Sequence, residues 1–335
     1  MTDEKLVDRF GRIHDYLRIS VTDRCNLRCV YCMPAEGVEF QPHSCILRFE
    51  EIVEVVKHAA SLGVKRLRLT GGEPLVRKDI EKLVYQLASI NEIEDIALTT
   101  NGIFLAQKAK VLKDVGLNRV NISLDTMKSE RYLAITRGGE LKRVLEAIEA
   151  SIEVGFSPIK LNVVLMRGIN DDEVNDFLRL TMHWPINVRF IEFMPIGETS
   201  DEWRSRYLPL STVLESAKEM GFTDVKKDSV FGNGPSENYR LPNAVGTFGL
   251  IHPVSDHFCN NCNRLRLTAD GNLKSCLYWQ DEVNVRSYIN NPMAMKQLFY
   301  KVISAKPENH EMAQAFDNQE PSHTPTSRRM SQIGG

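Results

Sequence analysis

Residues 16–34 read YLRISVTDRCNLRCVYCMP and join a β-branched run to three closely spaced cysteines. The run predicts a buried strand over residues 16–22, because β-branched and aromatic side chains favour strands. Three thiolates in C-x3-C-x2-C spacing can wrap one face of a [4Fe–4S] cluster and leave one iron open to another ligand. Structural zinc is the alternative, although it normally takes four Cys or His ligands. The trio consists of Cys25, Cys29 and Cys32.

Similar β-branched runs recur up to about residue 194 and alternate with amphipathic helical segments. Helical segments such as residues 49–63 and 104–116 end at a glycine, a common helix stop. This alternation predicts right-handed βαβ units and a parallel sheet, hence an α/β fold. Six such units leave two possibilities, an incomplete (βα)6 TIM-like barrel or an open sheet, each with its site at the C-terminal ends of the strands. The other five runs span residues 65–70, 95–100, 119–125, 159–166 and 187–194.

The composition argues against several classes of protein. The chain has 335 residues and a formal net charge of -2, so no global field would attract nucleic acid or a membrane surface. It has no apolar stretch of ~18 residues, and the first ten, MTDEKLVDRF, lack the apolar core of a secretory signal. We therefore expect a cytoplasmic protein that binds neither nucleic acid nor membrane. Seven cysteines in a reducing compartment favour metal ligation over disulfides.

A second cysteine trio lies in the C-terminal third of the chain, in C-x2-C-x13-C spacing. The segment at 264–277, RLRLTADGNLKSCL, predicts a β-hairpin that carries the last of these cysteines. His252 and His257 lie close enough in sequence to complete a zinc site, so the spacing alone fits both zinc and a second [4Fe–4S] cluster. Cys45 belongs to neither trio and is expected to be a passive thiol. The second trio is Cys259, Cys262 and Cys276.

Basic residues recur on the predicted strands. Strand alternation places Arg66 and Arg68 on one face, and Arg264 and Arg266 on one face of the hairpin. Single arginines on strands are commonly edge charges that face water. Several that converge on one cavity would instead bind a polyphosphate, because guanidinium groups match phosphate oxygens. The further basic residues of this set are Arg18, Lys160 and Arg189.

Longer strings of the sequence resemble the radical S-adenosylmethionine (SAM) superfamily and, within it, the GTP 3′,8-cyclase family. These strings are the two cysteine segments, LTGGEPL, ISLDTM, RFIEFMPIGE and the terminal MSQIGG, and they extend from about residue 16 to residue 335. The resemblance implies a radical SAM lyase that converts GTP to (8S)-3′,8-cyclo-7,8-dihydroguanosine 5′-triphosphate, the first step of molybdenum cofactor biosynthesis. It implies SAM and two [4Fe–4S] clusters as cofactors, with the second cluster binding the guanine of GTP.

The resemblance also implies roles for individual residues. Catalysis would involve Gly334 and Gly335, which have no side chains to clash in a narrow site, together with Arg264 and Arg266. The first cluster would be bound by Cys25, Cys29 and Cys32, and the second by Cys259, Cys262 and Cys276. SAM contacts would come from Tyr31, Gly72, Glu73, Ser123 and Met194. GTP contacts would come from Arg18, Arg66, Arg68, Thr99, Lys160, Arg189, Arg264, Leu265 and Arg266.

We expect three parts along the chain. Residues 1–230 would form the radical SAM partial barrel with the first cluster, residues 231–305 a C-terminal segment with the second cluster, and residues 306–335 a flexible tail that ends in Gly-Gly. The expected partners are GTP, a reducing electron donor and the next enzyme of the molybdopterin pathway, which takes the product. The protein would act as a monomer or homodimer. A radical SAM enzyme that modifies a peptide and a non-catalytic zinc protein are the rival interpretations.

Overall fold

One curved sheet organises the chain. The computed structural model describes residues 4–196, 201–229, 234–312 and 324–334. The strands in these ranges are β1 (Tyr16–Ser20), β2 (Arg66–Thr70), β3 (Asp95–Thr100), β4 (Arg119–Ser123), β5 (Ile159–Leu165), β6 (Ile186–Glu192), β7 (Lys226–Asp228), β8 (Glu237–Arg240), β9 (Thr247–Ile251), β10 (Arg264–Leu267), β11 (Asn272–Lys274) and β12 (Val283–Asn284). Their order across the sheet is β12-β11-β10-β1-β2-β3-β4-β5-β6-β9-β8-β7.

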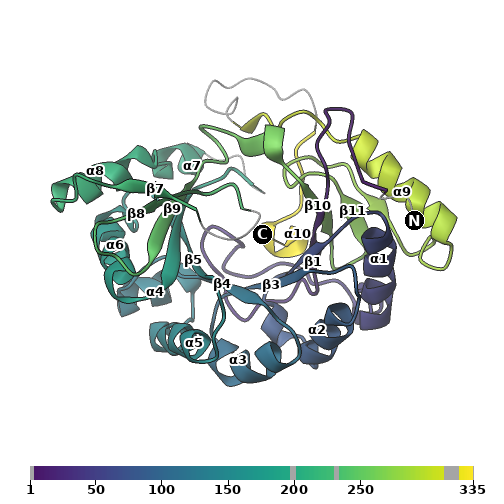
Figure 1. Cartoon of the computed structure of the whole chain (residues 1–335), viewed down its shortest axis with the longest axis horizontal. Helices are drawn as coiled ribbons and strands as arrows, with labels where there is room; N and C mark the ends of the chain where they lie inside the picture. Colours follow the sequence, from purple (N-terminus) through teal and green to yellow (C-terminus); the bar gives the residue numbers. More distant parts are fainter. Residues whose placement is uncertain (1–3, 197–200, 230–233, 313–323, 335) are drawn as a thin grey trace.

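The central part of the sheet is parallel and does not close on itself. The strands from β10 through β6 to β9 pair in parallel. Antiparallel pairs flank them, β11 with β12 at one edge and β7 with β8 at the other. Figure 1 shows the sheet as an arc with helices on its outer side. The incomplete barrel is therefore confirmed over the open-sheet alternative.

Helices cover the convex face because their apolar stripes match the apolar face of the strands. In β2, Leu67 and Leu69 are fully buried in the main core, together with Ile52 and Val55 of the first helix. Arg68, between the two leucines, points to the other face by strand alternation. The helices are α1 (Phe49–Ser61), α2 (Ile80–Ala88), α3 (Leu105–Asp114), α4 (Ser129–Thr136), α5 (Leu141–Glu153), α6 (Val174–His183), α7 (Asp201–Arg206), α8 (Ser211–Glu219), α9 (Pro292–Ser304) and α10 (Met330–Ile333).

The six predicted runs correspond to β1 to β6, and the predicted hairpin corresponds to β10 and β11. The strand β9 is not among the predicted runs. Its five residues are all buried, so the polar and apolar alternation that marks a half-exposed strand is missing. Because β9 pairs with β6, the sheet continues past the boundary expected at residue 230, which itself lies outside the described residues.

The C-terminal end of the described chain lies inside the arc. Figure 1 shows α10 on the concave side, next to β1 and β10, while α9 packs against α1 on the outside. A small apolar cluster holds this end in place, and it joins Ile333 to Tyr278, Trp279, Met312 and Ile196. The expected flexible tail of residues 306–335 is therefore described in two pieces, 306–312 and 324–334, and its remaining residues lie outside the described part.

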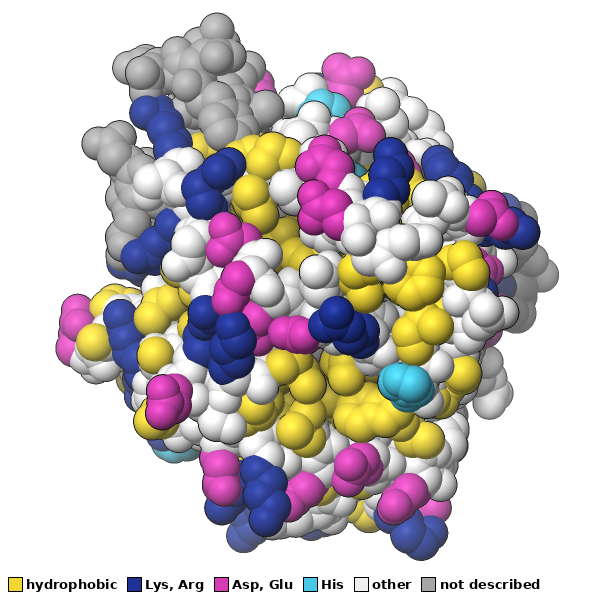
Figure 2. Space-filling model, turned by 90° about the vertical axis from the view of Figure 1, so that its left-hand side faces the viewer, with side chains coloured by type: hydrophobic (Ala, Val, Ile, Leu, Met, Phe, Trp, Pro, Cys, Tyr) yellow, Lys and Arg dark blue, Asp and Glu magenta, His cyan; other side chains and the backbone are white. Residues whose placement is uncertain are grey.

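The surface carries charges of both signs. Figure 2 shows Lys and Arg side chains interspersed with Asp and Glu over one face of the molecule. This mixture agrees with the net charge of -2 and gives that face no single sign. Among the described helices, none has the length and apolar character that crossing a bilayer requires.

Candidate active site

A cavity of about 260 Å³ lies on the concave face of the sheet. Its walls come from the cysteine loop after β1 and from the C-terminal parts of the parallel strands, where such folds place their sites. Met330 of α10 also lines it, so the C-terminal segment forms part of the wall. Among the residues predicted for a site, the cavity is lined by Arg18, Cys25, Cys29, Tyr31, Cys32, Arg68, Gly72, Thr99, Ser123, Arg189, Met194, Arg264 and Arg266.

The three cysteines of the first trio converge on this cavity. Burial, then the charge of the neighbouring Cys25, raise the pKa of Cys32 to about 12. Burial followed by the charge of Cys32 raises the pKa of Cys29 in the same way. Thiolates this close together repel one another unless a cation lies between them. The donor set therefore fits an iron–sulfur cluster, which binds deprotonated thiols.

The GGEP loop after β2 packs directly on the cysteine loop. Gly72 donates its backbone N–H to the carbonyl of Thr22, and Glu73 donates to the carbonyl of Arg24. A side chain would not fit here, because a Cβ on Gly72 would lie 2.3 Å from the Arg24 oxygen. A Cβ on Gly71 would lie 2.4 Å from the Thr22 oxygen. The glycines thus allow two backbone segments to pack directly against each other.

Glu73 is buried and bound within the protein. Its carboxylate accepts hydrogen bonds from Thr100 Oγ1 at 2.7 Å and from the backbone N–H groups of Asn101 at 2.7 Å and Leu75 at 3.0 Å. Burial outweighs these bonds and raises its pKa to about 7. Glu73 therefore ties the GGEP loop to the end of β3, and its contact with SAM stays a prediction.

Asp125 is a site residue that the sequence reasoning missed. It lines the cavity, follows β4 and accepts a hydrogen bond from the Tyr31 hydroxyl at 2.7 Å. Its second oxygen accepts from the backbone N–H of Val164 at 2.8 Å. Burial raises the pKa of Asp125 to about 6. The signal was its place as the last residue of the predicted run 119–125, in the string ISLDTM.

Basic residues gather on three neighbouring strands. Arg18 of β1 lies in register with Arg266 of β10 on one side and Arg68 of β2 on the other. Burial, then the charges of Arg266 and Arg68, lower the pKa of Arg18 well below its usual value. From further round the sheet, Arg189 donates to Asn121 at 2.8 Å and Asn162 at 2.6 Å. This excess of positive charge in a buried cavity calls for an anion.

Unused polar atoms in the cavity support the same conclusion. Within the described residues, Arg68 Nε, Arg189 Nε and Thr99 Oγ1 are buried without a hydrogen-bond partner. Each such atom costs free energy, about 1–3 kcal/mol, until a ligand or water satisfies it. A ligand with many acceptor oxygens would do so.

Three residues predicted to contact GTP lie outside the wall of the cavity. Arg66 forms an ion pair with Asp15 at the start of β2. Lys160 is buried on β5, and burial followed by the charge of Arg189 lowers its pKa to about 6. Leu265 has its side chain in the apolar core, so it can reach a ligand only through its backbone. These three contacts stay predictions.

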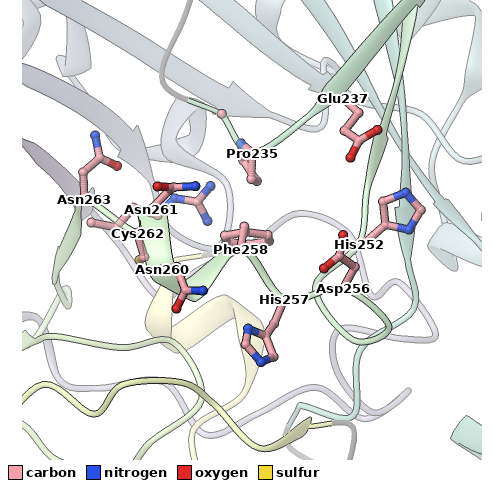
Figure 3. Close-up of a pocket in the computed structure, with 12 residues that line it drawn as sticks. Pro235, Glu237, His252, Asp256, His257, Phe258, Asn260, Asn261, Cys262 and Asn263 are labelled. Carbon is pink, nitrogen blue, oxygen red and sulfur yellow. The ribbon is translucent and has the colours of Figure 1, made fainter. Parts of the chain in front are cut away.

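The second trio lies beside a neighbouring pocket of about 540 Å³, shown in Figure 3, which Cys262 lines. Burial, then the charges of Cys276 and Cys262, raise the pKa of Cys259 to about 12. Burial also raises the pKa of Cys262, but Lys306 and Arg264 outweigh it and lower the value to about 7. The trio therefore fits a second cluster.

Two further residues, a histidine near the second trio and the seventh cysteine, have surroundings unlike those of the trio. His252, a candidate zinc ligand, has its Nδ1 3.5 Å from a carboxylate oxygen of Glu192. Cys45, which belongs to neither trio, is exposed, and its role as a passive thiol stays a prediction.

Gly334 of the C-terminal segment contacts Arg266, which lines the cavity. The carbonyl of Gly334 accepts a hydrogen bond from Arg266 Nη1 at 2.6 Å. A Cβ at this position would lie 2.6 Å from Thr70 Cγ2, and the backbone φ is +81°, so both space and conformation require glycine. Gly335, the other predicted catalytic glycine, lies outside the described residues.

Comparison with known proteins agrees with this site. The family model of the Radical SAM superfamily matches residues 19–181, and the model named Molybdenum Cofactor Synthesis C matches residues 186–312. A GTP 3′,8-cyclase of Listeria monocytogenes serotype 4b is 58% identical over 330 residues, covering 98% of this chain and 99% of that protein. The GTP 3′,8-cyclase of Lactiplantibacillus plantarum is 50% identical over 332 residues, covering 99% of this chain and all of that protein.

Solved structures share the fold at low sequence identity. Streptococcus suis SuiB bound to S-adenosylmethionine superposes with a TM-score of 0.60 at 13% identity, covering 92% of this chain and 69% of that chain. Native anSMEcpe with bound AdoMet also superposes with a TM-score of 0.60, at 16% identity, covering 89% of this chain and 82% of that chain. Given a radical SAM barrel, two cysteine trios and full-length relatives that agree, the chain belongs to the GTP 3′,8-cyclase family of the radical SAM superfamily.

Proposed function

We infer that this enzyme converts GTP to (8S)-3′,8-cyclo-7,8-dihydroguanosine 5′-triphosphate in the first step of molybdenum cofactor biosynthesis. Its family membership supports this reaction. The observation that carries it is the single cavity into which a thiol trio and several buried arginines open together. One part of that cavity suits an iron–sulfur cluster and the other suits a polyphosphate.

The cysteines would hold both clusters, and the cavity walls would orient the ligands. When bound, the first cluster and SAM supply the 5′-deoxyadenosyl radical that the reaction needs. Tyr31 is held by Asp125, which favours a fixed orientation for a SAM contact. Gly72, Ser123 and Met194 line the same cavity and support the predicted SAM site.

The triphosphate would bind the basic residues. Arg18, Arg68 and Arg189 offer guanidinium groups, and in addition to burial the charge of Arg68 lowers the pKa of both Arg18 and Arg189 by repulsion. Binding an anion removes this repulsion and satisfies buried N–H groups, so both contributions favour GTP. Thr99 offers a hydroxyl in the same cavity. The basic cavity also distinguishes this proposal from a peptide-modifying enzyme, whose substrate has no triphosphate.

The C-terminal glycine would complete the site from the other side. Arg266 binds the Gly334 carbonyl, and both Arg264 and Arg266 line the cavity. We propose that these residues hold the end of the chain next to the substrate. A closed, water-poor cavity would also protect reactive species from solvent.

The organisation and setting of the enzyme are also proposals. We propose a partial barrel at residues 1–230, a second-cluster segment at 231–305 and a tail at 306–335. A reducing protein would donate electrons, and the next enzyme of the molybdopterin pathway would take the product. The thiol-rich site favours a reducing compartment, the cytoplasm. The enzyme would act there as a monomer or homodimer.

Two measurements test this function. Anaerobic metal analysis should give about eight irons per chain for two clusters, whereas zinc without iron would exclude a radical enzyme. The reduced enzyme should consume SAM to form a cyclised nucleotide only when GTP is present. Equal consumption of SAM with and without GTP, and no cyclic nucleotide, would exclude GTP as the substrate.

A further inference from the structure

Lys306 is a deeply buried lysine that the proposed reaction does not use. It lies two residues beyond the end of α9, and only 3% of its surface is exposed. Its ammonium group lies 3.3 Å from the sulfur of Cys262 and 3.0 Å from the carbonyl oxygen of Arg264, to which it donates. The carbonyl of Cys262 is the third acceptor, at 3.5 Å. Burial of an ammonium group is unfavourable unless an anion offsets it, and the thiolate of Cys262 is such an anion.

The N-terminal segment fixes Lys306 against the second cysteine trio. Arg12 is buried and donates to the carbonyls of Pro307 at 2.8 Å and Glu308 at 2.7 Å, directly after Lys306. The same guanidinium donates to the carbonyl of Cys259 at 2.9 Å. One side chain therefore binds the residues that follow the lysine and the loop that carries the cysteines. This arrangement restrains the distance between Lys306 and the trio.

The side chains and N–H groups that donate hydrogen bonds to Cys25 and to Cys262 differ in charge, although Arg28 and Arg329 also act on the first trio from a distance. At the first trio, Cys25 accepts hydrogen bonds from the backbone N–H of Leu27 at 3.4 Å and from the side-chain amide of Asn101 at 3.9 Å, which are neutral donors. At the second trio, the donor to Cys262 is the ammonium group of Lys306. A cation in hydrogen-bond contact is the stronger of these influences on a sulfur ligand.

We propose that Lys306 is a positioning residue that raises the reduction potential of the second [4Fe–4S] cluster. This rests on the proposed ligands Cys259, Cys262 and Cys276. Reduction adds one electron, so the reduced cluster carries one more negative charge than the oxidised cluster. A fixed cation and an N–H···S bond stabilise the more negative state, and both are known means by which proteins set cluster potentials.

The experiment is a redox titration in which only the second cluster reports. In the full-length chain, Cys25, Cys29 and Cys32 are replaced by Ala, and the cluster is reconstituted and followed by electron paramagnetic resonance. In this background we compare Lys306 with Lys306→Met, Lys306→Gln and Lys306→Arg. Lys306→Met and Lys306→Gln should lower the midpoint potential of the second cluster by at least about 59 mV. For one electron, this corresponds to a roughly tenfold change in the reduction equilibrium. Lys306→Arg should restore it, because it keeps the charge and the donors.

A matched control uses the opposite background, with Cys259, Cys262 and Cys276 replaced by Ala. There Lys306→Met should leave the potential of the first cluster unchanged, and an equal fall at both clusters would overturn the proposal. A wild-type potential in Lys306→Gln would also overturn the proposal. This variant provides the test if Lys306→Met does not fold. Loss of the second cluster from every variant, Lys306→Arg included, would overturn it in favour of a purely structural lysine. If the cluster fails to form even with Lys306 present, the ligand assignment itself fails, an outcome that iron analysis identifies separately.

Discussion

At the scale of single residues, buried basic groups in and beside the cavity lower one another's pKa. Burial followed by the charges of neighbouring groups lowers the pKa of Arg18 and of Lys160. The pKa of Lys160 is lowered to about 6, so its charge changes near neutral pH. Substrate binding should therefore be coupled to protonation.

Lys160 provides a test of this coupling. Its pKa of about 6 leaves it largely neutral in the free enzyme at higher pH. The triphosphate should raise that pKa, so a proton is taken up with GTP. Because Lys160 has the higher pKa when GTP is bound, its contribution to the affinity for GTP is greatest below about pH 6. This contribution falls as the pH increases from the pKa of Lys160 in the free enzyme to its pKa in the GTP complex. Calorimetry at about pH 8 in buffers of different ionisation enthalpy should detect the uptake, since the γ-phosphate is then already deprotonated.

The control for this measurement is an exposed lysine on the outer surface of the protein. Lys142, with a side chain that is 79% exposed, can be changed to Met without an expected effect on proton uptake. Lys160→Met should abolish the uptake and weaken GTP binding. Uptake that is the same in the wild type and in Lys160→Met would show that Lys160 is not the group that titrates.

Arg266 is the second residue whose replacement discriminates between roles. It lines the cavity and also binds the Gly334 carbonyl. Loss of a charged hydrogen bond costs about 1.5–3 kcal/mol, so Arg266→Ala should weaken the use of GTP roughly 10–100-fold. The dissociation constant for SAM, measured separately, should change little. Equal losses for GTP and SAM would mean that Arg266 serves the fold and not the substrate.

Much of the site could be predicted from residue type and position. Both trios lie next to elements that were visible in the sequence, and the arginines follow strand alternation. The contact between Asp125 and Tyr31 could not be found in this way, because the two residues are 94 positions apart in the chain. The ion pair of Arg66 with Asp15 was equally hidden, since Arg66 and Arg68 share a face and only their depth along the strand separates them.

At the scale of elements, the site depends on loops that pack against each other at backbone distance. The GGEP loop lies on the cysteine loop because Gly71 and Gly72 have no side chains. The string alone indicated that glycines bring backbone close to something. Which partner they approach, a ligand or residues 22–24, depends on tertiary packing that no local pattern encodes.

Gly72→Ala tests this contact. The new Cβ would meet Arg24 backbone atoms at 2.3 and 2.6 Å, so one of the loops must move. We expect the first cluster to be lost and the iron content to fall from about eight to about four per chain. Gly155→Ala is the control, because its φ of +76° adds strain but nothing lies within 4 Å of the new Cβ. Full iron content in Gly72→Ala would mean that the close contact does not support the cluster.

The C-terminal segment is the other element whose contacts no local sequence pattern predicts. Residues 278–280 pair with residues 324–326 through hydrogen bonds of 3.0 and 2.7 Å. Arg328 then bridges Asp270 at 2.8 Å and Glu282 at 2.6 Å. The polar composition of this region favoured a flexible tail, and these partners lie about 50 residues earlier in the chain, beyond any sequence window.

Arg328→Ala should release the end of the tail. Both clusters and SAM binding should persist, while turnover falls because Gly334 is no longer held at Arg266. A double-mutant cycle with Asp270→Ala should give a coupling energy of about 0.5–3 kcal/mol for stability. Arg179→Ala, which removes an exposed ion pair with Asp176, is the control and should leave turnover unchanged. Wild-type turnover in Arg328→Ala would show that this bridge does not position the tail.

At the scale of the whole molecule, segments from both ends of the chain complete the open barrel. The alternation of strands and helices was enough to predict six βα units, and all six are present. The strand β9 escaped prediction because it is buried on both sides and too short to show a period. The N-terminal segment, which binds the second cysteine loop through Arg12, carries no motif at all. Its role emerges only from contacts between distant parts of the sequence.

The central claim is that one cavity unites radical chemistry with GTP. Anaerobic turnover of GTP carrying deuterium at its 3′ carbon, with SAM and a reductant, tests this most directly. Mass analysis should find the deuterium in 5′-deoxyadenosine, and a cyclised nucleotide one mass unit lighter than the labelled GTP. Unlabelled 5′-deoxyadenosine together with unchanged GTP would contradict the account.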